Sequence, residues 1–171
     1  YGEKSEGIDE YKGWAYACTK AIAEKVATVE LQLMRRRGDS EDEAVNEHPV
    51  LSLLRDVNPF LTKHDLFQST QSYLELDGNA FWWLSKNNSG EIEAVWPLRP
   101  DYVSAVPDRD LFVKHYVYTI GNEKFVLPVD DIIHFKEFNP KNPFRGLGSV
   151  VASMSAIEQD NFARDWNKEF F

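Results

Sequence analysis

Residues 142–160, NPFRGLGSVVASMSAIEQD, place an arginine and two glycines before a segment with helical spacing. Backbone N–H groups at the start of a helix can bind a phosphate, and glycines allow the close approach. A P-loop requires a lysine after its last glycine, and a dinucleotide site requires a third glycine and a parallel βαβ unit. None of these is found here. We therefore interpret the stretch as a tight turn at Gly146 and Gly148, followed by a helix that Ser149 caps.

Histidines could bind a metal or transfer protons, but no histidine in this chain has the partners of an HExxH or CxxC-type motif. The four histidines also lie far apart in the sequence, which favours a structural role for each of them. They are His48, His64, His115 and His134.

Acid, base and nucleophile candidates are equally weak. Asp130 and Asp131 are neighbours at the start of an expected strand, so they point to opposite faces and fit a solvated turn better than an acid/base pair. No serine lies in a G-x-S-x-G motif. Cys18 lies on the apolar side of an expected helix, where it would act as a small hydrophobe. The sequence predicts no catalytic, cofactor-binding or metal-ligating residue and therefore no enzyme.

Two clusters could instead bind a partner. Arg35, Arg36 and Arg37 are candidate phosphate contacts, although a solvated strand end balanced by the acidic residues that follow is favoured. Trp82 and Trp83 are neighbours in an expected strand, so one faces each side of the sheet. One of them is expected in the core. For the other, packing under a helix or against another subunit is favoured over stacking on a base.

A third cluster lies near the end of the chain. Phe162, Trp166 and Phe170 fall at i, i+4 and i+8, on one face of an expected helix. This face belongs either to the core or to an interface with missing sequence or a neighbouring subunit. The pattern ends without a capping signal, so we expect the chain to be a piece of a longer protein.

The composition limits the class of protein. With 171 residues, 43% of them hydrophobic and 13% aromatic, the chain is long enough for one folded domain. Its net charge of −9 argues against tight binding of nucleic acid, which depends on Lys and Arg, but allows passing contact with DNA. A single cysteine excludes an intrachain disulfide and favours a reducing compartment. No signal peptide and no run of about 20 apolar residues is present.

Hydrophobic spacing predicts an α+β fold, with helices packed on a mainly antiparallel sheet. Residues 1–12 are expected to be a flexible segment and residues 13–171 to be the domain. A strand is expected at 29–33, followed by an acidic loop. Hairpins should turn near 87–90 and 121–123, with further strands near 102–106 and 130–138. Helices are expected near residues 13–27, 48–57, 63–77 and 149–171.

Over about residues 14–171 the sequence resembles the portal proteins of tailed bacteriophages, of the HK97-like type. The similarity is carried by YACTKAIAEKVATVELQLMRR, by HPVLSLLRDVNPFLTKHDLFQSTQSYLELDGNAFWWLSKNNSGEIEAVWPLRPDYVSAV and by LPVDDIIHFKEFNPKNPFRGLGSV. No single motif is catalytic, but their order and spacing are specific. The chain departs from the family at Val29-Glu30, where Leu-Pro is frequent, and at Gly148-Ser149-Val150, where Ser-Pro after Gly-Leu is frequent.

The resemblance implies a non-enzymatic subunit of a ring, typically dodecameric, at one capsid vertex. Double-stranded DNA is packaged and ejected through such a ring without being tightly bound. The implied partners are terminase, capsid and head-completion proteins, with no cofactor and no membrane. The chain would be the N-terminal, wing-type part, truncated before the stem, clip and crown. It would be encoded by a prophage and found in the virion, and in the bacterial cytoplasm during assembly.

Two other functions remain open from the residues alone. One is a soluble interaction module without a phage role, whose aromatic faces bind a peptide or a protein. The other is an enzyme with an unrecognised pocket around His134 and residues 146–148.

Overall fold

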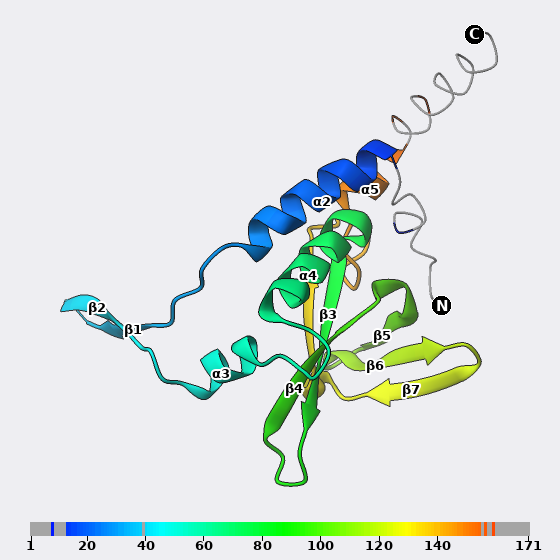
Figure 1. Cartoon of the computed structure of the whole chain (residues 1–171). Helices are drawn as coiled ribbons and strands as arrows, with labels where there is room; N and C mark the ends of the chain where they lie inside the picture. Colours follow the sequence, from blue (N-terminus) through cyan, green and yellow to red (C-terminus); the bar gives the residue numbers. More distant parts are fainter. Residues whose placement is uncertain (1–7, 9–12, 39, 155, 157–158, 160–171) are drawn as a thin grey trace.

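The computed structural model describes residues 8, 13–38, 40–154, 156 and 159, and the statements below concern these residues. The larger elements follow one another as a helix, a small hairpin, two helices, six strands and a short helix (Figure 1). They are α2 (Gly13–Ala27), β1 (Met34–Arg37), β2 (Ser40–Ala44), α3 (Pro49–Arg55), α4 (Lys63–Asp77), β3 (Asn79–Lys86), β4 (Ile92–Leu98), β5 (Val103–Asp108), β6 (Phe112–Ile120), β7 (Glu123–Leu127), β8 (Ile132–Lys136) and α5 (Ser149–Ala152).

The strands form three antiparallel sheets, in the orders β1-β2, β4-β3-β8 and β5-β6-β7. Helix α4 packs on β3 and β4, and α2 lies across α4 on the side away from the strands (Figure 1). The α+β prediction is therefore confirmed, and so are the hairpin turns between β3 and β4 and between β6 and β7.

Helix α4 begins and ends where its local sequence predicts. Thr62 and Asp65 form a reciprocal capping box, in which the Thr62 side chain accepts from the Asp65 N–H and the Asp65 carboxylate accepts from the Thr62 N–H. At the other end Gly78 has φ 83°, a left-handed conformation that stops the helix at low steric cost. The chain then turns directly into β3.

Two apolar clusters hold the strands and α4 together. Phe81, Leu98, Val103, Tyr116 and Ile132 are buried between the two larger sheets. On the other face of β3, a second cluster lies against α4 and includes Trp82, whose indole N–H donates to the Thr70 hydroxyl at 2.8 Å. The two clusters confirm that Trp82 and Trp83 face opposite sides and that one of them, Trp82, belongs to the core. The buried members of the second cluster are Val57, Leu66, Trp82 and Val95.

The buried face of α2 does not include Cys18, in contrast to the prediction. The helix contacts α4 through a stripe of small residues at i, i+4 spacing: Ala15, Thr19, Ala23 and Ala27. Small side chains let two helices approach closely, so the larger apolar residues are turned outward. Trp14 is 69% exposed, Ile22 is 43% exposed, and Cys18 is an exposed free thiol rather than a buried hydrophobe.

Residues 28–48, which we call the arm, also differ from the prediction. Residues 29–33 do not form a strand, and the expected acidic loop contains β2, which pairs with β1. The register places Arg35 opposite Glu43, so opposite charges face each other across the small hairpin. Figure 1 shows the arm extending away from the body before α3 returns to it.

The start of the last helix also differs from the prediction that Ser149 caps it. Gly148 is the N-cap of α5 and no side chain caps it, so Ser149 is the first helical residue instead of the cap. Val150 joins Ala15 and Leu76 in a third small cluster, which fixes α5 beside α2. Within the described residues, no helix is both long and apolar enough to cross a membrane.

Candidate functional site: a buried polar cluster between two exposed flanks

Arg145 is the centre of a polar cluster inside the described fold. One guanidinium nitrogen donates to both carboxylate oxygens of Asp77, each at 2.9 Å, and the other donates to the carbonyl of Val103 at 3.2 Å. The side chains of Arg145 and Asp77 are only 17% and 4% exposed. The pair joins the end of α4 to the start of β5 and to the loop after β8.

Asn79 continues this cluster into the sheet. Its amide nitrogen donates to Asp77 Oδ1 at 2.6 Å, while its Oδ1 accepts from the backbone N–H of Gly146 at 2.7 Å. His134 Nε2 lies 3.0 Å from the same Oδ1, and Tyr116 Oη lies 3.4 Å from His134 Nδ1. Each polar atom named here has a partner from a different part of the chain, as a buried polar group requires.

His134 is held neutral inside the fold. Burial, with smaller contributions from the positive charges of Lys136 and Arg145, lowers its pKa to about 4. Its ring stacks on Phe81, with centroids 4.1 Å apart. Its ring nitrogens lie within hydrogen-bonding distance of Asn79 and Tyr116, so this perturbed histidine joins β8 to β3 and β6.

The two glycines of the Arg-Gly-Leu-Gly stretch are required by close backbone contact. A Cβ on Gly146 would lie 1.9 Å from the carbonyl oxygen of Gly78, and one on Gly148 would lie 2.7 Å from the carbonyl oxygen of Glu75. The tight turn expected from the sequence is thus a close approach to the end of α4. In addition, the Gly146 N–H already donates to Asn79 Oδ1 at 2.7 Å, so this backbone group is not free to bind a phosphate.

The predicted binding residues are placed far from this cluster. Arg35 and Arg36 are exposed on β1 of the arm, together with Arg37, of which only the backbone is described. Of the expected tryptophan pair, Trp83 lines an open hollow of about 400 Å³ beside the apolar cluster between the two larger sheets. Phe162, Trp166 and Phe170 lie outside the described residues. No cluster of metal-ligating side chains occurs in the described part of the chain.

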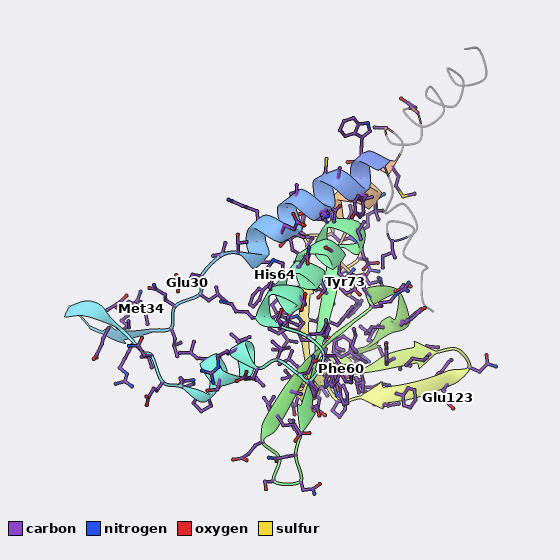
Figure 2. All side chains as sticks on the ribbon, in the orientation of Figure 1. Glu30, Met34, Phe60, His64, Tyr73 and Glu123 are labelled. Carbon is purple, nitrogen blue, oxygen red and sulfur yellow. The ribbon has the colours of Figure 1, made fainter. Side chains whose placement is uncertain are left out.

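Two of the regions that expose apolar side chains lie on opposite flanks of the molecule. The arm exposes Val29 and Leu31, at 57% and 45%. On the other flank, strand β7 exposes Phe125 and Val126, at 45% and 64%. Figure 2 shows these flanks on opposite sides of the body, marked by Glu30 on the arm and Glu123 on β7. Large exposed apolar surface of this kind is typical of protein–protein contact sites.

Sequence reasoning missed the Asp77–Arg145 pair, because its members are 68 residues apart and neither lies in a catalytic motif. The only available signal was Arg145 itself, a charged residue directly before two glycines. Because the glycines bring their loop against the end of α4, the residue before them can be buried there as well.

The family model described as "Phage portal protein" matches residues 14–171. A curated protein of Rickettsia bellii (strain RML369-C), described as an uncharacterized protein, is 23% identical over 168 residues, which cover 94% of this chain and 42% of the relative. The present chain therefore spans less than half the length of that relative.

Chains in solved structures of particles are also similar to this chain. A chain in the neck of an empty GTA particle, computed with C6 symmetry, is 25% identical, with a TM-score of 0.85 over 99% of this chain and 47% of that one. A chain in the virion of a native gene transfer agent particle is 28% identical, with a TM-score of 0.78 over 91% of this chain and 40% of that one. The neck of the native GTA particle, computed with C12 symmetry, contains a chain that is 27% identical, with a TM-score of 0.77.

Proposed function

The chain belongs to the phage portal protein family, and from this premise we propose that it is part of a subunit of a portal ring through which DNA enters and leaves a particle. The observation that carries the proposal is the likeness to the GTA neck chain, which extends over 99% of this chain with a TM-score of 0.85. Necks computed with C6 and C12 symmetry contain repeated copies, in agreement with a ring-forming subunit.

We further propose that the subunit is structural and has no catalytic activity. The polar residues that come together around Arg145 and His134 bond to one another and to backbone carbonyls. A catalytic site needs at least some of its polar groups turned toward a space that a substrate can enter. In this fold the same groups tie α4, β3, β8 and the following loop into one body.

The rest of the proposal concerns the whole protein. Residues 13–171 would form the N-terminal, wing-type domain of an HK97-like portal. The stem, clip and crown would lie in sequence beyond this chain, in agreement with relatives more than twice its matched length. Terminase, capsid and head-completion proteins would dock on the assembled ring. The gene would belong to a prophage, and the subunit would assemble in the bacterial cytoplasm before entering the virion.

Contact with DNA would be transient. The chain has 28 acidic and 19 basic residues, so its average field repels phosphate and suits a passage that DNA crosses without adhering. Arg35, Arg36 and Arg37 on the arm remain the candidates for local phosphate contact. Their opposite strand is acidic, which would limit the strength of that contact.

Electron microscopy of the full-length gene product tests the proposal. A portal subunit should give closed rings with a central opening in class averages. Single particles of subunit size would contradict the ring and would favour the alternative, a soluble interaction module whose exposed aromatic faces bind other proteins.

A further inference from the structure

Residues 29–33 have the pattern of a strand but no partner strand. Val29, Leu31 and Leu33 alternate with Glu30 and Gln32, which is typical of a strand with one buried face. In the structure this segment is extended and, within the described residues, the backbone N–H groups of Glu30, Leu31 and Gln32 have no backbone partner. A segment with this pattern is expected to pair with another chain when its own fold offers nothing.

Strand β7 presents a matching edge. It is the last strand of the β5-β6-β7 sheet, and no described strand pairs with its outer side. Two of the competing edges, those of β4 and β5, are less open. Asn58 donates to the carbonyl of Val95 and thereby covers β4, while Pro107 and the bond from Arg145 to the Val103 carbonyl interrupt β5.

The two segments face away from each other on one subunit. Figure 1 shows the arm on one side of the body and the β6–β7 hairpin on the other. A segment on one flank cannot reach an edge on the opposite flank of the same body, but it can reach that edge on a neighbouring copy. Contacts between two different surfaces of identical subunits generate rings when the rotation closes.

We propose that residues 29–33 of one subunit pair with the outer edge of β7 of the next subunit, so that the β5-β6-β7 sheet gains a fourth strand at each subunit contact. The occupant of the β7 edge is a second copy of this chain. The inference rests on the proposed ring and identifies the surfaces that join its subunits.

The side chains of the two segments are complementary. Leu31 lines a hollow of about 370 Å³ with Leu51 and Leu54. Phe125 lines the hollow beside Trp83 on its own subunit and is still 45% exposed, so its exposed edge can enter the Leu31 hollow of a neighbouring copy. In the extended sheet, Leu31 and Phe125 would then lie on the same face. Because side chains alternate along a strand, Glu30 and Lys124 would lie together on the opposite face.

The rim of the same hollow adds a second charge match. Arg55 and Lys63 line this rim, and Glu123 lies two residues before Phe125, on the same side of β7. The incoming strand would therefore bring a carboxylate toward two basic side chains as its aromatic ring enters the hollow. All of these contacts require one orientation of β7, in which Phe125 and Glu123 face the hollow and Lys124 faces Glu30.

Thiol cross-linking in the full-length protein tests this pairing. Cys18 is first changed to Ser, because it is an exposed thiol. Glu30→Cys and Lys124→Cys are then introduced singly, and both positions are exposed. Rings assembled from the two single variants together should give covalent dimers with a short bismaleimide, whereas either variant alone should give none. The double variant should give a ladder of multimers, because each subunit then links to both neighbours.

Ser89→Cys, at the tip of the β3–β4 hairpin, is the matched control, and together with Glu30→Cys it should give no dimers. Rings without cross-linked dimers, or a double variant that cross-links only within one subunit, would overturn the strand pairing and leave the proposed function intact. Failure of the unmodified protein to form rings would contradict both.

Discussion

Arg145 and Asp77 form an ion pair in which one guanidinium nitrogen bonds both carboxylate oxygens at 2.9 Å. The carboxylate side chain is 4% exposed, so removing it would leave a largely buried positive charge without its partner. Breaking such a pair costs about 3–5 kcal/mol, whereas a pair at the surface contributes about 0–1 kcal/mol.

We therefore expect Asp77→Ala to lower the free energy of unfolding by about 3 kcal/mol in chemical denaturation. The control is Arg99→Ala, which breaks a more exposed pair with Asp101 and should cost at most about 1 kcal/mol. Equal effects of the two substitutions would mean that the Asp77–Arg145 pair does not hold the elements together.

Because His134 is neutral in the fold, the free energy of unfolding should depend on pH. In the unfolded chain this histidine binds a proton near its ordinary pKa of 6.5, whereas in the fold its pKa is about 4. Between these values the unfolded state binds more protons, so the free energy of unfolding should fall as pH decreases from 6.5 toward 4, by up to about 3 kcal/mol. His134→Gln should remove this part of the pH dependence in denaturation series. His64→Gln, at the exposed surface of α4, is the control for loss of a histidine.

In the loop between β8 and α5, Gly146 is required by a close backbone contact, whereas Ser149 does not cap the helix. Substitutions at the two positions should therefore have different effects on stability. Gly146→Ala places a methyl group 1.9 Å from the carbonyl oxygen of Gly78 and should destabilise the fold by about 3 kcal/mol. Ser149→Ala should change stability by less than about 0.5 kcal/mol, because no side chain caps α5. A loss of about 1 kcal/mol in Ser149→Ala would restore Ser149 as the cap.

The aromatic face of residues 162–170 remains a prediction from the sequence. Full burial of such side chains stabilises by roughly 2–3 kcal/mol each, so we expect them to be covered in the assembled particle. In the full-length protein, Trp166→Ala should impair ring formation, measured by native mass spectrometry, more than it lowers the melting temperature. Trp82→Ala, which removes a buried ring under α4, should show the opposite order. Normal rings in Trp166→Ala would make this face ordinary core or surface.

Local signals explain which elements the sequence predicts. The Thr62–Asp65 capping box, the left-handed Gly78 and the turn residues at 87–90 each act over a few positions, so helix α4 and the β3–β4 hairpin follow from their own residues. Alternation likewise separates the two faces of β3.

Long-range contacts explain the errors. The small residues of α2 are buried because α4 approaches closely, and hydrophobicity ranks Trp14 and Ile22 above Ala15 and Ala23. The strand pattern at 29–33 is real in the sequence, but within the described residues only Leu33 bonds across to the arm hairpin, where its carbonyl accepts from the Val45 N–H, and no strand pairs with the rest. No local pattern indicates that Arg145 reaches Asp77 across the fold.

Native mass spectrometry of the full-length gene product tests the central claim most directly, because it counts the subunits of a portal ring. We predict one closed assembly with a mass that is an integral multiple of the subunit mass, with twelve copies expected from the C12 symmetry of the related neck. A protein that stays monomeric or dimeric at assembly concentrations would contradict the account.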